Sequence, residues 1–113
     1  MNIEKETLEQ LKKSHPGGIY EGSITFEDEE HNQREVCFIH RKPTTADIEA
    51  HSKTAQRSPL VANLNIIAGL IIYPEPGPVI DAIREYPAAY SRFVDEGISH
   101  FFGGNVSIKT RKL

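Results

Sequence analysis

The stretch Arg41-Lys42-Pro43-Thr44-Thr45-Ala46-Asp47-Ile48 marks the point where strand-like sequence gives way to helical sequence. Pro43 favours an extended conformation at the residue before it, and Thr44 or Thr45 can then serve as a helix N-cap. Asp47 follows Thr44 at the spacing of a capping box, and its charge suits the N-terminal end of a helix. The stretch therefore predicts a helix that begins directly after a strand.

Alternation of apolar and polar residues precedes this stretch and predicts a β-hairpin over residues 18–42. The polar run at residues 27–33 has the composition of the connecting loop. A lone hairpin is only marginally stable in water, so its apolar face should pack on helices. The residues expected on that face are Tyr20, Ile24, Phe26, Val36, Phe38 and His40. Ahead of the hairpin, residues 3–14 can form a short surface helix.

Helical patterns follow residues 41–48, which we call the opening stretch. The first helix should cover residues 45–57, with Ile48, Ala55 and either His51 or Ser52 facing inward. Ser58 is a good N-cap and Pro59 suits the first helical position, so a second helix should begin there. This second helix, residues 60–72, is apolar on nearly all sides and should form the core of the fold, with Leu60, Leu64, Ile67 and Ile71 on one face and Val61, Ile66 and Leu70 widening it.

A proline-rich break at residues 73–78 separates this apolar helix from two further helices, residues 78–86 and 87–102. The inward residues of the shorter one should be Val79, Ile80 and Ile83. The fold class predicted is α+β, an N-terminal hairpin packed on a mainly helical part of about four short helices. Within one domain of residues 1–113, we expect an N-terminal arm (1–17), the hairpin (18–42), the helical part (43–103) and a flexible tail (104–113).

Composition limits the classes of function. A formal net charge of −3 gives no general attraction to nucleic acid. The amino terminus lacks the apolar run of a signal peptide, and the most apolar stretch is too short to span a bilayer. The single cysteine, Cys37, excludes an intramolecular disulfide and fits a reducing compartment. The sequence therefore predicts a cytoplasmic protein with neither a membrane nor a nucleic-acid partner.

Few side chains suggest chemistry. Asp47 and His51 have the spacing of two metal ligands on one helix, and His40 is close in sequence, so a small metal-binding enzyme or regulator is one alternative. Capping by Asp47 and surface exposure of His51 explain the same residues. Cys37 and His40 lie three apart on a strand and should point to opposite faces, which disfavours a catalytic dyad. We expect no enzyme activity, catalytic residue, cofactor or metal site.

Residues 38–50, FIHRKPTTADIEA, combine a strand with a basic residue, Lys-Pro, a hydroxyl residue and an acidic residue that open a helix. Ser58-Pro59-Leu60, an apolar helix, a proline-rich break and Glu85-Tyr86-Pro87 follow in order. Over residues 20–103 this pattern resembles the tail assembly chaperones of long-tailed bacteriophages and prophages. The structural motif that carries the resemblance consists of Pro43, Thr44, Asp47, Ser58 and Pro59.

The resemblance implies a protein that binds and solubilises the tape-measure protein while the tail is built, and that is absent from the mature virion. It also implies self-association and, through a frameshifted longer form, contact with the tail-tube protein. A structural tail subunit is a further alternative. Apolar surface beyond what two small helices must bury could complete the core or bind a partner. The residues proposed for such binding are Leu64, Ile67, Leu70, Ile71, Tyr90, Phe93, Phe101 and Phe102.

Overall fold

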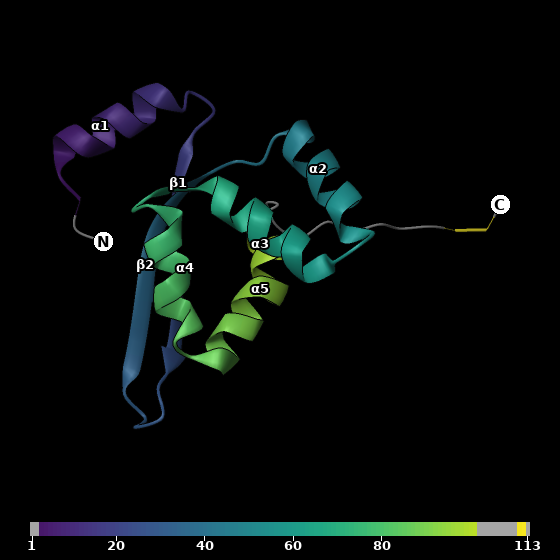
Figure 1. Cartoon of the computed structure of the whole chain (residues 1–113). Coiled ribbons are helices and arrows are strands. Elements are labelled where there is room, and N and C mark those ends of the chain that lie inside the picture. The colour runs from purple at the N-terminus through teal and green to yellow at the C-terminus, as the bar shows by residue number, and fades with distance from the viewer. Residues whose placement is uncertain (1–2, 102–110, 113) are drawn as a thin grey trace.

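The computed structural model describes residues 3–101 and 111–112. Its elements in chain order are α1 (Lys5–Ser14), β1 (Ile19–Glu27), β2 (Gln33–Arg41), α2 (Thr45–Ala55), α3 (Pro59–Leu70), β3 (Ile71–Tyr73), α4 (Pro76–Arg84) and α5 (Pro87–Phe101). The strands form one antiparallel sheet in the order β1-β2-β3 (Figure 1). The α+β fold predicted from the sequence is confirmed, including the hairpin near the N-terminus and the four helices after it.

The β1–β2 hairpin is regular along the whole of both strands. Gly22 lies opposite Phe38, and a Cβ atom added at Gly22 would come within 2.7 Å of Cε2 of the Phe38 ring. Carbon atoms pack at about 3.5–4.0 Å, so only glycine leaves room for the ring to lie across the neighbouring strand. The glycine thus allows the largest side chain of β2 to enter the core.

Most of the predicted apolar face of the hairpin is confirmed. Phe38 is buried in the core, and three partly buried residues pack against it: Ile24, Phe26 and Val36. Tyr20 differs, because it lies on the margin of the sheet and is exposed. Its ring stacks on His40 at 5.6 Å between centroids, and His40 also contacts the ring of Phe38 at 6.0 Å. His40 is therefore buried among aromatic rings.

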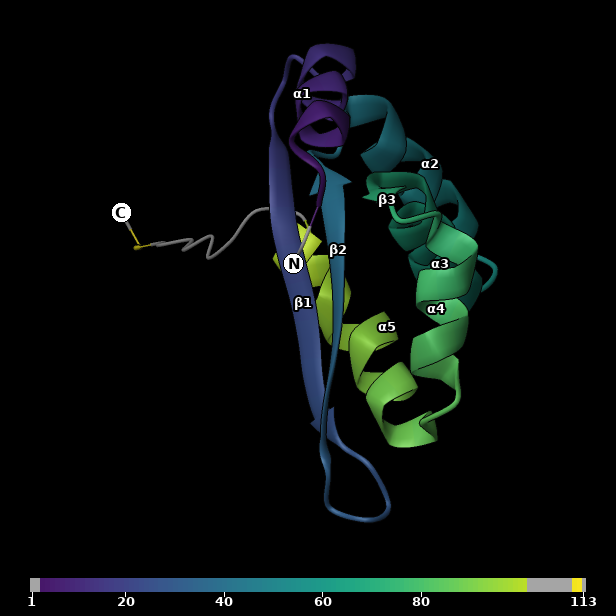
Figure 2. The ribbon, with the colours of Figure 1, turned by 90° about the vertical axis from the view of Figure 1, so that its left-hand side faces the viewer.

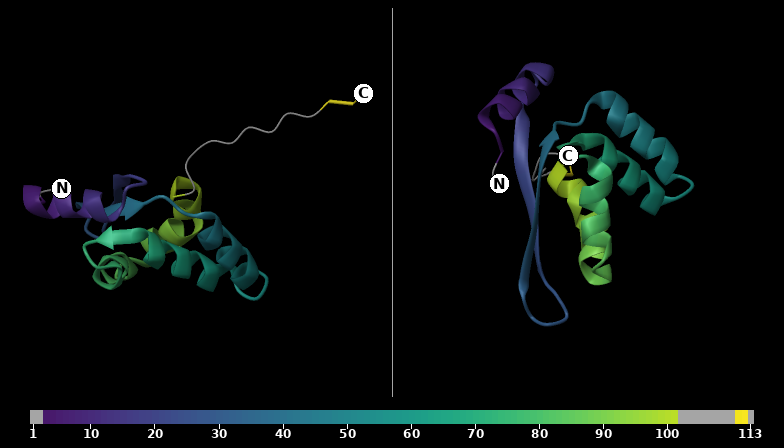
Figure 3. Two further views of the ribbon diagram at one scale, coloured as in Figure 1. Left: turned by 90° about the horizontal axis from the view of Figure 1, so that it is seen from above. Right: turned by 60° about the vertical axis from the view of Figure 1, so that its left-hand side comes forward.

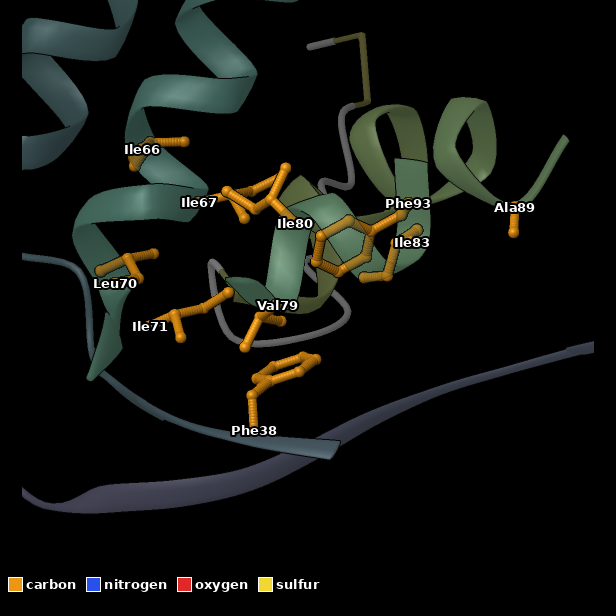
Figure 4. Close-up of a cluster of buried hydrophobic side chains, with 10 residues drawn as sticks. All are labelled: Phe38, Ile66, Ile67, Leu70, Ile71, Val79, Ile80, Ile83, Ala89 and Phe93. Carbon is orange, nitrogen blue, oxygen red and sulfur yellow. The ribbon is translucent and has the colours of Figure 1, made fainter. Parts of the chain in front are cut away.

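The apolar helix α3 forms the centre of the core, as its sequence predicts. Its buried residues are Ala62, Ile66, Ile67 and Leu70. Figure 4 shows the cluster that Ile66, Ile67 and Leu70 help to form, in which residues of α4 and α5 meet the Phe38 ring of the hairpin. In α4 the predicted inward residues Val79, Ile80 and Ile83 are all buried. The helix before the proline-rich break and the helix after it therefore share one core.

Three details differ from the sequence-based expectations. Residues 71–73 leave the helix and form β3, which pairs with β2 through Ile71 opposite His40. Leu60 and Val61 are 53% and 46% exposed, because they lie in the first turn of α3, at the end farthest from the sheet (Figure 1). The expected inward stripe of α2 is wrong at Ile48, which is 43% exposed, since α2 turns Asp47 and His51 toward α3 instead.

The two faces of the sheet are covered unequally. The helices α3, α4 and α5 cover the face that carries Phe38, α2 packs on α3, and α1 lies over the opposite face (Figures 2 and 3). Leu8 and Lys12 of α1 line a small pocket there with Ile19 and the buried Ile39. No helix within the described residues is long and apolar enough to cross a membrane.

Candidate functional site

The opening stretch forms a joint between β2 and α2. The guanidinium group of Arg41, at the end of β2, donates to both carboxylate oxygens of Asp47, at 2.8 and 3.2 Å. Asp47 also accepts a hydrogen bond from the backbone N–H of Thr44 at 2.7 Å, while the Thr44 hydroxyl accepts one from the Asp47 N–H at 3.2 Å. The predicted capping box is confirmed, and the same carboxylate ties the helix to the end of the strand.

The electrostatics of this joint follow from its geometry. The hydrogen bond from Arg41 holds the pKa of Asp47 far below its usual value of 3.8, and the Thr44 N–H acts in the same direction. The same contact raises the pKa of Arg41. Both side chains are about three-quarters buried, so the charges are only partly screened by solvent. Both oxygens of Asp47 accept hydrogen bonds within the joint, and the residue acts as a structural anion.

The predicted start of a second helix at Ser58-Pro59, a helix restart after α2, is also confirmed. The Ser58 hydroxyl accepts a hydrogen bond from the Val61 N–H at 3.3 Å, and Pro59 occupies the first turn of α3. Together with Pro43, which precedes the capping box, these residues complete the structural motif proposed from the sequence. All of its members shape the chain.

The three residues of the metal-site alternative have other partners. His51 Nε2 lies 2.8 Å from Oδ1 of Asn63, whose amide nitrogen donates to the backbone carbonyl of Val94 at 3.1 Å. His40 Nδ1 lies 3.2 Å from the carbonyl oxygen of Arg41. Within the described residues, no three or more His, Cys, Asp or Glu side chains form a group that could hold a metal ion. His40, Asp47 and His51 are therefore not brought together.

Cys37 is placed away from His40. Its Sγ donates to a carboxylate oxygen of Glu35 at 3.1 Å, and this hydrogen bond raises the pKa of the thiol. Since the thiolate is the nucleophile, a raised pKa lowers its reactivity at neutral pH. The sequence-based argument that Cys37 and His40 point to opposite faces agrees with the alternation along β2, where His40 shares its face with Phe38.

The acidic loop between the strands is organised by Asp28. Its carboxylate accepts hydrogen bonds from the N–H groups of Glu30 and Asn32, both at 2.9 Å, and from Arg34 at 2.9 Å. The hydrogen bond from the Asn32 N–H is the largest cause that lowers the pKa of Asp28. Asp28 therefore holds the loop in its turn conformation, which gives the acidic run a structural role.

The feature most suited to binding is a groove of about 330 Å³ between β1 and α5. Its floor and walls are mainly apolar, and its rim carries Arg92 and Glu96, which pair with each other at 3.3 Å. The residues that line it are Ser23, Ile24, Thr25, Phe26, Phe38, Ala89, Arg92, Phe93, Glu96 and Gly97. The groove opens to solvent beside the outer strand of the sheet, so it can receive apolar side chains from another molecule.

The predicted partner-binding residues divide into three groups. Ile67, Leu70 and Ile71 are in the core, where they cannot reach a partner. Leu64 and Tyr90 are partly buried at the edge of the core, and Phe93 is itself buried but lines the groove. The side chains of Phe101 and Phe102 lie outside the described part of the chain, as does most of the predicted tail.

The sequence reasoning missed the groove itself. Ile24 and Phe26 were expected on the inward face of the hairpin, which is where they lie. The pattern gave no sign that α5 would leave part of that face open. Alternation of apolar and polar residues identifies the apolar face of the hairpin. How much of that face the helices cover depends on how they pack.

Comparison with known proteins adds a family and a fold. A family model described as "Domain of unknown function (DUF6848)" matches residues 11–111. The solved structure of the uncharacterised protein rbstp2171 from Bacillus stearothermophilus covers 92% of this chain and 99% of its own, with a TM-score of 0.62 and 19% identity. At that identity the likeness shows the fold alone. No curated protein matches the sequence. The chain belongs to the DUF6848 family.

Proposed function

We propose that this protein is a tail assembly chaperone of a phage or prophage, which binds apolar helical segments of a tape-measure protein in the host cytoplasm. The observation that carries the proposal is the open apolar groove between β1 and α5. The order of motifs along the chain supports it, since the opening stretch and the Ser58-Pro59 restart resemble those of that family.

The groove fits a helical client by its chemistry. A helix with one apolar face binds by placing side chains spaced three or four residues apart into an apolar groove. The partly buried Ile24 and Phe26 supply the accessible apolar surface above the buried Phe38 and Phe93, and the charged rim of Arg92 and Glu96 favours a client with polar flanks. A groove of about 330 Å³ takes a few side chains, whereas a whole helix is about 10–12 Å across. One chain would thus hold one short stretch of client.

The proposal is tested by co-expression with the tape-measure protein encoded nearby, followed by affinity purification and measurement of the dissociation constant. We expect a complex that Ile24→Asn and Glu96→Lys both weaken. Glu96 is exposed, so its substitution leaves the core intact. The matched control is Leu60→Asn, which removes an exposed apolar side chain outside the groove. An absent complex at micromolar protein would refute the proposal, and equal weakening by the control would refute the groove.

A structural tail subunit would also associate with tail proteins. Mass spectrometry of finished virions separates the two roles, because a chaperone leaves before the particle is complete. We expect the chain to be absent from purified virions and present in the lysate from which they assemble.

A further inference from the structure

The outer edge of β1 is long and regular. β1 is the terminal strand of the sheet, and among the described elements it has a strand neighbour on one side only (Figure 2). Its pairing with β2 has no bulge, and Ile19–Glu27 contains neither proline nor lysine. Bulges, prolines and lysines commonly protect natural edge strands, because an open edge pairs readily with another strand. The edge of β1 is therefore suited to strand addition.

The alternation of hydrogen bonds indicates which residues serve that edge. The Asp28 N–H donates to the carbonyl of Asn32 at 3.0 Å, directly after the last pair of the β1–β2 register. Hydrogen-bonded and non-hydrogen-bonded pairs alternate in an antiparallel ladder. The odd-numbered residues of β1, from Ile19 to Glu27, therefore direct their N–H and C=O groups away from β2. Ser23 is at the centre of this row.

We infer that two copies of this chain join through antiparallel pairing of their β1 strands, centred on Ser23, into one continuous sheet. This inference deepens the proposed function by naming the contact between copies, and only the binding of a client helix along the joined grooves rests on that function. In this register Tyr20 lies opposite Phe26 of the second copy, and Gly22 lies opposite Ile24. Both pairs are on the helix-covered face, where the aromatic pair of Tyr20 and Phe26 would stabilise the joined sheet, while Gly22 adds no side-chain contact to Ile24.

The charges of β1 are compatible with its own copy. Glu27 falls opposite Ile19 of the second copy, and Glu21 falls opposite Thr25, so no two like charges face each other directly. Glu21 and Glu27 of the two copies lie on a diagonal, about 7–8 Å apart. Lys12 of α1 lines the pocket that contains both Ile19 and Glu21, which places a positive charge beside that diagonal. Directly opposed like charges therefore do not hinder the pairing of β1 with its own copy.

The pairing has a consequence for the groove. The two-fold axis of an antiparallel edge contact is perpendicular to the sheet, so the helices of both copies lie on the same face. Each groove adjoins its own β1, and the two grooves would meet across the shared edge, with one α5 on each side. The dimer would then offer a trough longer than one chain provides, suited to a longer stretch of the client helix.

The test uses a cysteine on the proposed axis. Ser23 lies opposite the native Cys37 in the same chain, so the variant Ser23→Cys is made in a Cys37→Ser background. Hydrogen-bonded partners have Cα atoms about 5.5 Å apart, within disulfide range. We expect mild oxidation of the full chain to give a disulfide-linked dimer. The control is Ser91→Cys in the same background, an exposed position on α5 that should give little disulfide-linked dimer under the same oxidation.

Light scattering of the unmodified chain gives an independent measurement. A dimer mass is expected, and Ser23→Lys should weaken dimerisation about tenfold by placing two lysines opposite each other. Ser91→Lys adds the same charge elsewhere and should leave the dimer intact. A monomer at high micromolar concentration, or a dimer that Ser23→Lys leaves unchanged, would overturn the inference, as would pairing of β1 with a segment of its own chain. If the unmodified chain forms the dimer but does not bind the tape-measure protein, the proposed function is refuted and the β1 pairing is not.

Discussion

Replacing Asp47 by alanine removes two interactions at once, and their sum can be worked out from the structure. Loss of the capping box with Thr44 should cost about 1 kcal/mol. The contact with Arg41 is bidentate, but both side chains are about one-quarter exposed, so we assign it only about 1 kcal/mol after solvent screening. We therefore expect the free energy of unfolding to fall by about 2 kcal/mol at neutral pH.

Urea denaturation followed by circular dichroism measures this loss. The matched control is Asp81→Ala, which breaks an exposed pair with Arg84 at 3.5 Å and should cost less than about 0.5 kcal/mol. A double-mutant cycle with Arg41→Ala isolates the ion pair from the cap. A loss for Asp47→Ala no larger than that of the control would refute the idea that this carboxylate joins strand and helix.

The pH dependence gives a second check on the same residue. The pKa of Asp47 is lowered in the folded state, so its contribution is present above its ordinary value of 3.8 and is lost as the pH falls below that value. The difference in stability between the unmodified chain and Asp47→Ala should be constant from pH 7 to about pH 5 and should shrink as the pH falls below about 4. A difference that does not change in acid would contradict the ion-pair assignment.

Three further predictions concern single positions. Gly22→Ala should lower the free energy of unfolding by about 1–3 kcal/mol through overpacking against a buried ring, whereas Gly69→Ala, with open space at its Cβ, should be neutral or stabilising; urea denaturation measures both. Asn63→Ala should cost about 1–3 kcal/mol in the same assay, because it leaves partly buried polar groups on two other helices without this partner. Glu35→Gln should speed the reaction of Cys37 with a disulfide reagent at pH 8, followed by absorbance, because removing the carboxylate lowers the pKa of the thiol; an unchanged rate would contradict that cause.

Much of the fold could be predicted because its signals are local. The capping box at Thr44 and Asp47, and the cap at Ser58, each depend on residues within one turn of a helix. The alternation in the hairpin likewise predicted which face Phe38 would take. Such signals are carried by the chain itself and survive whatever tertiary environment forms around them.

The parts that could not be predicted depend on distant partners. Residues 71–73 continue an apolar helical pattern, yet they become β3 because the free side of β2 offers backbone hydrogen bonds. Ile48 was expected inward, but contacts of α2 with α3 decided the rotation of the helix. The groove depends on where α5 comes to rest against β1. In each case tertiary contacts override a weak local preference.

The attachment of α2 has a consequence for motion. This helix has no fully buried residue, and two polar contacts hold it, one from Asp47 to Arg41 and one from His51 to Asn63. Polar contacts are directional and lose most of their strength after a small displacement, whereas apolar packing weakens gradually. Helix α2 should therefore detach as a unit before the rest of the molecule unfolds. Its backbone amides should exchange with deuterium by local opening, sooner than those of α3.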